Sequence, residues 1–534
     1  MPHLHMCMIF LKKSTPVNLM LNNPTYKNKK MITDINLLGL SEEQIEIFEK
    51  IIQGKNVFLT GSAGTGKSFL IQAIKKHLPS IKAARENPEW AERIHQVNTN
   101  NIRTVHMINS SNTVRTINVL HSSNETHTIL DGCPRLIRVR VVALTGCAAI
   151  LLGQGAKTLH SWAGIGKGQE TVSELATKIR RSSRANRNWL TTDVLIIDEI
   201  SMLTGELLEK LDALAKRLRA SNQPFGGIQV VFVGDFFQLP PVVKEKDSHT
   251  NVFAFQSPIW QTIISHQNEI HLHKIHRQND PVFQRILLEA RYGKLSQESC
   301  KILESRMGLN WQSARIRPTL LFPRRAEVDM INENNLRAIT GIKYTYKADI
   351  TFSEKFPIET FNKNNPEFVR ILESMDREAP YLAELTLAKD AQVMLIYNLD
   401  LERGLSNGSR GVVVGFDETA ANIPIVEFTN GMRIPIGRQS WEIEDYVGVL
   451  RTQIPLRLAY ACTIHKSQGA SIDCALIDIG TSTFEYGQAY VALSRVRSLE
   501  GLYIHEFVPG AVRAHPDVFK RFENNYCRPN EDPE

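Results

Sequence analysis

Short apolar runs recur along the chain from residue 57 onward, and each is followed by or ends in Gly, Thr or Asp. Runs of this length, separated by helical patterns, are typical of buried parallel strands. Between two of them, apolar residues fall on one face of a predicted helix, which indicates core packing. The pattern therefore predicts an α/β fold. The runs lie at residues 57–60, 141–144, 194–197, 230–233 and 475–477, and the helical face contains Leu207, Leu208, Leu211, Leu214, Ala215 and Leu218.

Two segments interrupt this pattern. Residues 96–130 are rich in Asn, Ser and Thr, and this composition predicts an inserted surface loop rather than part of the sheet core. Residues 393–450 contain short strand-like runs joined by the pairs Asn407-Gly408 and Asn430-Gly431. Because Asn-Gly pairs favour tight hairpin turns, this segment predicts a small β-barrel inserted in a second α/β domain.

Composition and charge narrow the possible classes of protein only slightly. The 534 residues are 42% hydrophobic and 22% charged, which suits several globular domains. The formal charge of +7 favours a polyanionic partner. The seven cysteines include no CxxC pair, which favours a reducing compartment. The apolar stretches are shorter than the roughly 20 residues that a membrane helix needs, so no membrane partner is expected.

Residues 1–33 form a basic segment with five lysines and no acidic residue. The segment follows neither a helical nor a strand period, so we expect a flexible tail. A transit peptide is the alternative, although arginine is absent and serine is scarce there.

A phosphate-binding loop directly follows the first apolar run. The run of residues 61–68 fits the pattern GxxxxGK[ST] and precedes a helical pattern. Its glycines let backbone N–H groups wrap phosphate oxygens, and the helix N-terminus adds positive potential. We expect Lys67 to hold the β and γ phosphates of ATP and Ser68 to bind Mg²⁺. The nucleotide-binding residues are Gly61, Ser62, Ala63, Gly64, Thr65, Gly66, Lys67 and Ser68.

Two carboxylates follow the strand at residues 194–197. Asp198 and Glu199 emerge at its C-terminal end, where ligands bind in parallel sheets. Asp198 suits Mg²⁺ coordination, and Glu199 suits the orientation and deprotonation of an attacking water. A pair of surface acids is the alternative, and this alternative is less favoured once Lys67 is accepted as a phosphate-binding residue. The sequence therefore indicates hydrolysis as well as nucleotide binding.

Three further side chains are candidates for the γ-phosphate. Gln238 follows the strand at 230–233, within the run Gly-Asp-Phe-Phe-Gln-Leu-Pro-Pro, although such a run is also an ordinary loop. Hydrolysis also needs positive charge on the developing γ-phosphoryl group, which guanidinium groups supply well. Arg277 and Arg495 are candidates for this role, but among many arginines the residues alone do not select them.

The order of these motifs resembles that of the Pif-one family of superfamily 1B DNA helicases, over residues 40 to about 515. The resemblance is carried by Gln44, the phosphate loop, Thr145-Gly146-Cys147-Ala148-Ala149, Thr158-Leu159-His160-Ser161, Asp198-Glu199-Ile200-Ser201-Met202, residues 234–241, His276-Arg277-Gln278, residues 463–469 and residues 490–495. The segment 206–227, ending Pro-Phe-Gly-Gly, looks like the insertion that marks this family.

The resemblance implies two RecA-like lobes with ATP between them. Gln44 would lie near adenine, and Arg277 and Arg495 would reach across from the second lobe. The likeness also implies a single-strand channel that contacts mainly phosphate and sugar. Its residues would be Thr145, His160, Ser161, His465, Lys466 and Ser467.

The expected domain order follows from the same likeness. Lobe 1 spans residues 34–258, with the insertion at 96–130 and a basic wedge at 164–190 that would meet a duplex junction; a solvated basic helix is the alternative for the wedge. Lobe 2 spans 259–345 and 451–515. An inserted domain at 346–450 carries a small barrel of the Src-homology-3 kind, and residues 516–534 form a C-terminal tail.

The implied function is an ATP- and Mg²⁺-dependent DNA helicase that moves 5′ to 3′ on single-stranded DNA. As a monomer it would unwind forked duplexes or G-quadruplexes in replication, repair, recombination or telomere maintenance. The nucleus is the expected compartment, with the mitochondrion or a viral replication site as alternatives. A superfamily 1B RNA helicase and a non-catalytic nucleic-acid binder are the competing hypotheses.

Overall fold

The computed structural model describes residues 39–523, apart from short internal gaps. The expected basic tail at 1–33 therefore lies outside the described residues. No helix in the described part is both long enough and apolar enough to cross a membrane. The gaps are residues 87–101, 109–113, 122–126, 130–136, 153–155, 242–251, 312–315, 323–324, 354–355, 357–360, 380, 401–402, 444–445 and 447.

Lobe 1 contains a parallel sheet with the strand order β6-β5-β7-β8-β1-β9. Every residue of β1, β7 and β8 is buried, as the apolar runs predict. The expected boundary of lobe 1 at residue 258 is wrong, because β9 pairs with β1. Its four residues include Glu269 and His271, so this edge strand has no apolar run to reveal it. The strands are β1 (Val57–Gly61), β5 (Val139–Ala143), β6 (Lys157–Thr158), β7 (Val194–Asp198), β8 (Gln229–Val233) and β9 (Glu269–Leu272).

Helices cover both faces of this sheet. Successive strand residues point to opposite faces, and in β1 Leu59 packs in one hydrophobic cluster and Phe58 in the other. The Leu59 face is covered by α2 (Glu42–Ile52), α3 (Lys67–Glu86) and α5 (Gly146–Leu151). The Phe58 face is covered by α6 (Leu159–Ala163), α7 (Val172–Arg181), α8 (Ser183–Thr191) and α9 (Gly205–Arg219), together with the short helices η3 (Ile200–Met202), η4 (Pro224–Gly227), η6 (Ala254–Gln256) and α10 (Trp260–Ile263).

The polar segment 96–130 contains strands, so the prediction of a loop is wrong. Its strands β2 (Ile102–Ile108), β3 (Val114–His121) and β4 (His127–Ile129) form an antiparallel sheet separate from the lobe 1 sheet. The Ile, Val and Thr residues that favour strands lie within β2 and β3, whereas the Asn and Ser residues fall mainly between them. Averaging the composition over the whole segment concealed this division.

Lobe 2 contains a second parallel sheet, with the order β21-β10-β22-β23. Two α/β lobes confirm the predicted fold class. The strands are β10 (Thr319–Phe322), β21 (Ala461–Thr463), β22 (Ala475–Ile479) and β23 (Leu502–Phe507). Its helices are α11 (Pro281–Tyr292), α12 (Gln297–Glu304), α13 (Arg325–Ala338), α15 (Ile464–Ser467) and α16 (Gln488–Leu493), with the short η10 (Pro509–Ala511) after β23. The short η7 (His266–Asn268) precedes β9 and so belongs to lobe 1.

The inserted domain consists of antiparallel sheets with the orders β11-β13, β12-β19-β18 and β17-β16-β15-β14-β20. The third sheet lies where the small barrel is predicted; its Src-homology-3 character stays a prediction. Because β11 and β20 pair within this domain, it spans 343–458 rather than 346–450. Its elements are β11 (Lys343–Lys347), β12 (Asp349–Phe352), α14 (Pro366–Glu378), β13 (Glu384–Ala388), β14 (Gln392–Leu395), β15 (Arg410–Asp417), η9 (Glu418–Ala420), β16 (Ile423–Phe428), β17 (Arg433–Pro435), β18 (Gln439–Glu442), β19 (Val449–Gln453) and β20 (Leu456–Leu458).

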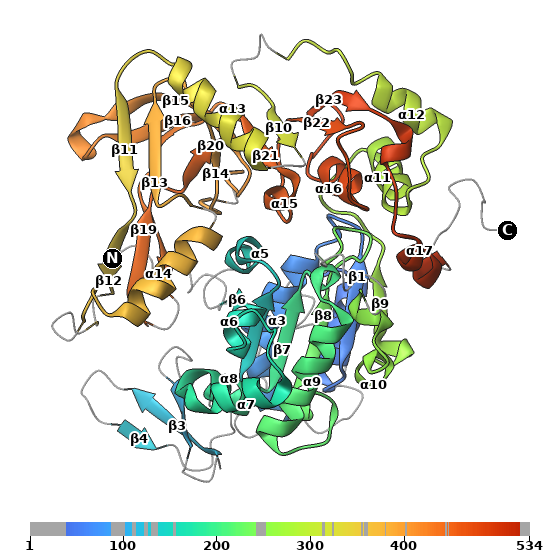
Figure 1. Ribbon diagram of the computed structural model, residues 1–534, viewed down its shortest axis with the longest axis vertical. Coiled ribbons are helices and arrows are strands. Elements are labelled where there is room, and N and C mark those ends of the chain that lie inside the picture. The colour runs from blue at the N-terminus through green and yellow to red at the C-terminus, as the bar shows by residue number, and fades with distance from the viewer. Residues whose placement is uncertain are drawn as a thin grey trace, which may run out of the picture.

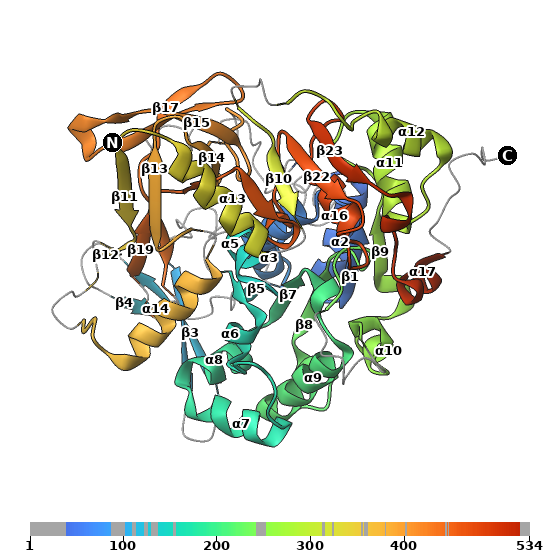
Figure 2. The same cartoon turned by 45° about the horizontal axis from the view of Figure 1, so that its top comes forward.

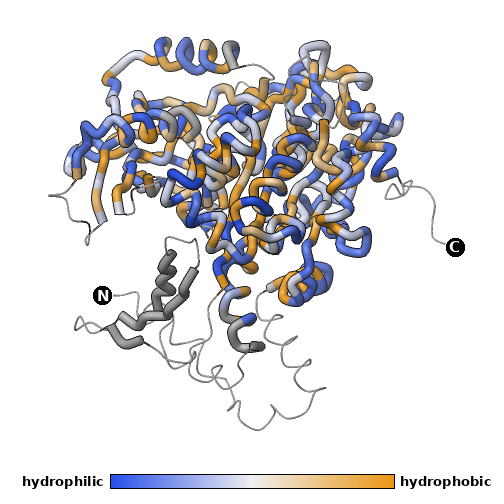
Figure 3. The backbone as a smooth tube through the Cα atoms, turned by 60° about the horizontal axis from the view of Figure 1, so that its bottom comes forward, coloured by the Kyte–Doolittle hydropathy of each residue, from blue (hydrophilic) through white to orange (hydrophobic). Residues whose placement is uncertain are grey.

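The three parts are separate in the ribbon drawing. Figure 1 shows lobe 1 in the lower half, the β10, β22 and β23 sheet of lobe 2 at upper right, and the inserted domain at upper left. Figure 2 keeps the same arrangement after rotation. In Figure 3, outer helices alternate between hydrophilic and hydrophobic residues along their length, as expected for helices with one face against the protein.

Helix α17 (Pro516–Phe522) joins lobe 2 back to lobe 1, so the predicted tail boundary at 516 is wrong. The Phe522 ring lies 6.4 Å from Phe58 and stacks at 6.0 Å on Phe236, measured between centroids. On the same helix, the Phe519 ring contacts Tyr292, the last residue of α11. These aromatic side chains belong to one buried cluster that includes residues of both lobes. Residues 524–534 lie outside the described part.

We expect Phe522→Ala to destabilise the protein by about 3 kcal/mol, because it leaves a cavity in the cluster that joins the lobes. Phe522 is 8% exposed, whereas Phe484 is 50% exposed. Phe484→Ala is therefore the control and should change stability little. Urea unfolding measures both variants, and equal midpoints for Phe522→Ala and the wild type would contradict the role given to α17.

Candidate active site between the lobes

The phosphate loop connects the end of β1 to the start of α3. Gly64 and Gly66 have φ angles of +89° and +82°, a left-handed backbone that glycine adopts without strain. Lys67 begins α3, and its Nζ donates to the carbonyls of Gly61 at 2.8 Å and Ser62 at 2.9 Å. Burial lowers the pKa of Lys67 to about 8, although Asp235 and Glu199 act in the opposite direction. The lysine is therefore held over the loop by oxygens that anionic phosphates could replace.

Lobe 2 contacts the phosphate loop directly. The backbone N–H of His276 donates to the Gly64 carbonyl at 2.8 Å. A Cβ added at Gly64 would lie 2.7 Å from the Cβ of Arg277, so a larger residue at this position cannot fit without moving lobe 2. On the other side of the loop, the Gln44 side chain donates to the Gly66 carbonyl at 3.4 Å. Gln44 thus lies beside the loop, as the family likeness implies.

Asp198 and Glu199 lie where β7 ends, as predicted. The Asp198 carboxylate accepts a hydrogen bond from the Glu199 backbone at 2.9 Å, and Glu199 has a left-handed backbone with φ of 57°. Burial, followed by the charge of Glu199, raises the pKa of Asp198 to about 7. Burial also raises the pKa of Glu199. A buried and a half-buried acid side by side suit a divalent cation, which would favour their ionised forms.

These oxygen donors fit Mg²⁺. Ser68 follows Lys67 at the start of α3, and its side chain is exposed rather than buried in the core. A serine hydroxyl and an aspartate carboxylate are hard oxygen ligands of the kind that Mg²⁺ prefers, with water and phosphate oxygens completing its shell. Ser68 and Asp198 are therefore the residues that would hold the ion.

Gln468 connects two of the predicted residues and was not singled out from the sequence. Its amide donates to the Glu199 carboxylate at 2.8 Å and to the Gln238 side-chain oxygen at 3.4 Å. Gln468 belongs to the run 463–469 of lobe 2, where only the neighbouring residues were assigned a role. The contact spans 269 positions from Glu199, so sequence spacing could not reveal it.

Both candidate arginines lie at the same seam, where Arg495 is buried and Arg277 is half-buried. Arg277 donates to the backbone carbonyl of Ser494 at 3.0 Å, and Arg495 donates to the Ser494 hydroxyl at 2.7 Å. Burial and then the nearby charge of Arg495 lower the pKa of Arg277 to about 9. Burial also lowers the pKa of Arg495, while Glu199 opposes that shift. Two guanidinium groups held near each other and near Glu199 form a cationic site suited to a phosphoryl group.

The predicted channel residues are divided between the lobes. Thr145 caps the start of α5 by accepting from Ala148 N–H at 3.2 Å, and His160 and Ser161 lie on α6. In lobe 2, His465 on α15 is exposed, whereas Ser467 is buried and donates to the Ile464 carbonyl. Figure 1 shows α5 and α15 on the facing sides of the two lobes. The side chain of Lys466 lies outside the described residues.

The basic segment 164–190 forms α7 and α8 at the surface of lobe 1. The inner side of α7 buries Leu175, Ala176 and Ile179. Its outer side exposes basic residues, and Lys178 pairs with Glu170 at 2.9 Å. The segment is thus an anchored surface helix pair with outward positive charge, and its wedge role stays a prediction. The exposed basic residues are Lys167, Lys178, Arg180, Arg181 and Arg187.

A phosphate loop in one α/β lobe and two arginines that reach it from a second define a two-lobed P-loop nucleotide-binding fold. Comparison with known proteins then identifies the family. The family model described as PIF1-like helicase matches residues 39–87 and 129–300, and the model for the 2B domain of DNA helicase Pif1 matches residues 371–416. The chain belongs to the PIF1-like helicase family, which is the family that the motifs predicted.

Relatives and solved structures agree with this assignment. The zebrafish (Danio rerio) ATP-dependent DNA helicase PIF1 is 36% identical over 92% of this chain and 65% of its own length. The Saccharomyces cerevisiae ATP-dependent DNA helicase RRM3 is 30% identical over 91% of this chain and 68% of its own length. The chain thus spans slightly less than two thirds of the first of these relatives.

Two structures share the fold. The Pif1 helicase from Candida albicans has 34% identity and a TM-score of 0.63, covering 91% of this chain and 99% of that chain. A structure of two coordinating Pif1 helicases, concerned with unwinding at forked double-stranded DNA, has 27% identity and a TM-score of 0.52, covering 91% of this chain and 98% of that chain.

We expect Gly64→Ala to weaken nucleotide binding by at least roughly tenfold, because its left-handed backbone and its contact with Arg277 both exclude a side chain. Gly54→Ala is the matched control, since Gly54 has φ of +81° but nothing within 4 Å of an added Cβ. Titration with a fluorescent ATP analogue measures both. Equal affinities for the two variants would mean that the Arg277 contact is unimportant.

Proposed function

We propose that this protein is an ATP-dependent DNA helicase that moves 5′ to 3′ along single-stranded DNA and unwinds duplex or G-quadruplex DNA. The supporting observation is the seam itself, where Lys67, Asp198 and Glu199 of lobe 1 meet Arg277 and Arg495 of lobe 2. The named relatives are ATP-dependent DNA helicases. The 5′ to 3′ direction comes from the family likeness alone.

Each residue has a role that follows from its place. Lys67 binds the β and γ phosphates, and the backbone N–H groups of the loop surround them. Gln468 holds the Glu199 carboxylate, so that Glu199 can orient and deprotonate a water facing the γ-phosphate. Arg277 and Arg495 neutralise the charge that develops during transfer. A Mg²⁺ held by Asp198 and Ser68 would supply further charge neutralisation.

Movement along DNA follows from the division of the site between lobes. ATP attracts both Lys67 and the arginines, so binding draws the lobes together and loss of phosphate releases them. Thr145 and His160 on lobe 1, and His465 on lobe 2, would contact a strand between the lobes. Burial lowers the pKa of the half-buried His160, so it would act as a neutral hydrogen-bonding group. Contacts to phosphate and sugar imply weak sequence preference.

The biological setting is proposed from the family likeness. We place the protein in genome maintenance, comprising replication, repair, recombination and telomere maintenance, and in the nucleus. A monomer is proposed as the active form, whereas the forked-DNA structure described above contains two coordinating Pif1 helicases. Sedimentation on a forked substrate tests the stoichiometry, and imaging of a tagged chain tests the compartment.

Lys67→Ala should abolish ATP hydrolysis and unwinding but preserve single-strand binding, since the channel residues lie elsewhere. Lys50→Ala is the control, because Lys50 makes only a surface ion pair with Glu46 and a backbone contact. ATPase assays with single-stranded DNA and fluorescence anisotropy measure the two properties. Full unwinding by Lys67→Ala would refute the active site.

Forked or tailed duplexes test substrate and direction together. We expect unwinding of a duplex with a 5′ single-stranded tail and none with only a 3′ tail. Matched RNA strands should stimulate ATP hydrolysis less than DNA strands. Preference for a 3′ tail would overturn the direction, and stronger stimulation by RNA would favour the RNA helicase.

A further inference from the structure

A buried ion pair joins lobe 1 to lobe 2 beside the phosphate loop. Arg291, at the end of α11, donates to both carboxylate oxygens of Asp235 at 2.9 to 3.1 Å. The side chains are 0% and 2% exposed for Asp235 and Arg291. Burial alone would raise the pKa of Asp235, but the guanidinium outweighs it and lowers that pKa. The pair is therefore ionised and fixed in a bidentate geometry.

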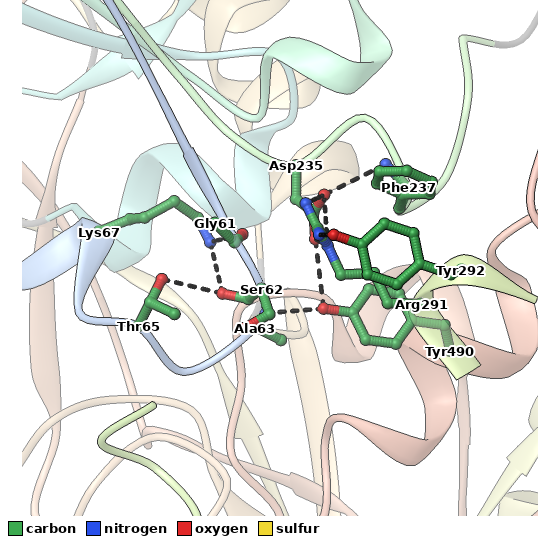
Figure 4. Close-up of polar contacts among 10 residues, drawn as sticks. All are labelled: Gly61, Ser62, Ala63, Thr65, Lys67, Asp235, Phe237, Arg291, Tyr292 and Tyr490. Carbon is green, nitrogen blue, oxygen red and sulfur yellow. Dashed lines mark hydrogen bonds and ion pairs between the residues drawn. The ribbon is translucent and has the colours of Figure 1, made fainter. Parts of the chain in front are cut away.

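Tyr490 connects this pair to the phosphate loop. Its hydroxyl accepts a hydrogen bond from the Ala63 backbone N–H at 2.7 Å and donates to Asp235 at 3.2 Å. Figure 4 shows the hydroxyl between Ala63 and Asp235, with Arg291 beside the carboxylate. Burial raises the pKa of Tyr490, so the hydroxyl keeps the proton that it donates.

The same carboxylate shapes the segment that carries Gln238. Asp235 accepts a hydrogen bond from the Phe237 backbone N–H at 3.2 Å, which fixes the turn one residue before Gln238. Asp235 thus organises the Gln238 segment, while Tyr490 contacts the phosphate loop. Both loop segments belong to lobe 1, but the groups that connect them, Arg291 and Tyr490, belong to lobe 2.

Stability alone does not explain such a pair. Apolar residues of similar volume in a buried site are often as stabilising as an ion pair, or more so. The helix α16 offers another explanation, because it carries Tyr490 and leads directly to Arg495. The contacts that hold the Tyr490 hydroxyl on Ala63 therefore also place the Arg495 guanidinium near Glu199.

We propose that Tyr490, held by the Asp235 and Arg291 pair, is a positioning residue. Through Tyr490, the shape of the phosphate loop depends on whether lobe 2 is closed on lobe 1. The inference rests on the proposed ATPase function and deepens it. When α16 packs against lobe 1, the backbone of Ala63 and the guanidinium of Arg495 are in place together. Hydrolysis is then efficient only with lobe 2 closed on lobe 1.

The chain offers a closely matched control. In the inserted domain, the Tyr381 hydroxyl donates to Asp376 at 3.0 Å, and Asp376 pairs with Arg451 at 2.6 Å. Tyr381 is 1% exposed, as is Tyr490. Tyr381→Phe thus removes a hydroxyl from the same kind of Tyr, Asp and Arg cluster, in the inserted domain and away from the phosphate loop, Arg277 and Arg495.

The experiment compares Tyr490→Phe with Tyr381→Phe in the full chain at saturating single-stranded DNA. We expect Tyr490→Phe to lower the kcat of ATP hydrolysis roughly three- to tenfold, the range of one hydrogen bond, with KM changed less than about twofold. Tyr381→Phe should keep the wild-type kcat and KM. Arg291→Lys, which keeps the charge but loses the bidentate geometry, should lower kcat further.

Two results would overturn the proposal. One is a wild-type kcat for Tyr490→Phe. The other is an equal loss of kcat in Tyr490→Phe and Tyr381→Phe in proportion to their loss of thermal stability, which would mean a structural role only. A wild-type chain that does not hydrolyse ATP with DNA would instead refute the proposed function, so the two failures are distinguishable.

Discussion

Opposite charges that arrive from two lobes at one buried seam constrain the rest of this structure. Burial raises the pKa of Asp198 and Glu199 and lowers the pKa of Arg277 and Arg495. Burial disfavours the charged form of each group when that group is alone. Charges on the opposite lobe, or a bound anion and cation, stabilise the charged form. The relative position of the lobes and the charge state of the site therefore depend on each other. Gln468, which crosses the seam to Glu199, adds a neutral contact to the same arrangement.

The apolar contacts near the seam fix the relative position of the two lobes. The aromatic cluster of Phe58, Phe236 and Phe522 is continuous between the lobes and carries no charge that would compete with the nucleotide. Close packing of this kind resists small displacements. It therefore lets the polar groups beside it, such as Asp235, keep an exact geometry while water is excluded.

The sequence predicts what depends on a strand and the turn that follows it. Strands β1, β5, β7 and β8, the phosphate loop and Asp198 were located because each is local in the chain, and the predicted α/β class is confirmed. The contact of Tyr490 with Ala63 spans 427 positions, and no periodicity or spacing encodes it. Strand β9 was missed because it is short and half polar, so that only its pairing with β1 reveals it, whereas β2 was missed because composition was averaged over the whole segment.

Helix α17 determines how the lobes can move. The chain crosses from lobe 1 to lobe 2 between β9 and α11, and returns between β23 and α17, where Arg521 binds Glu269 of β9 at 2.7 Å. Both crossings lie on the right-hand side of Figures 1 and 2, where β9, α11 and α17 are drawn. Two attachments on one side favour rotation about a single axis over sliding. Because displacement grows with distance from such an axis, a small adjustment near these attachments becomes a larger excursion on the other side of the molecule, where the inserted domain lies.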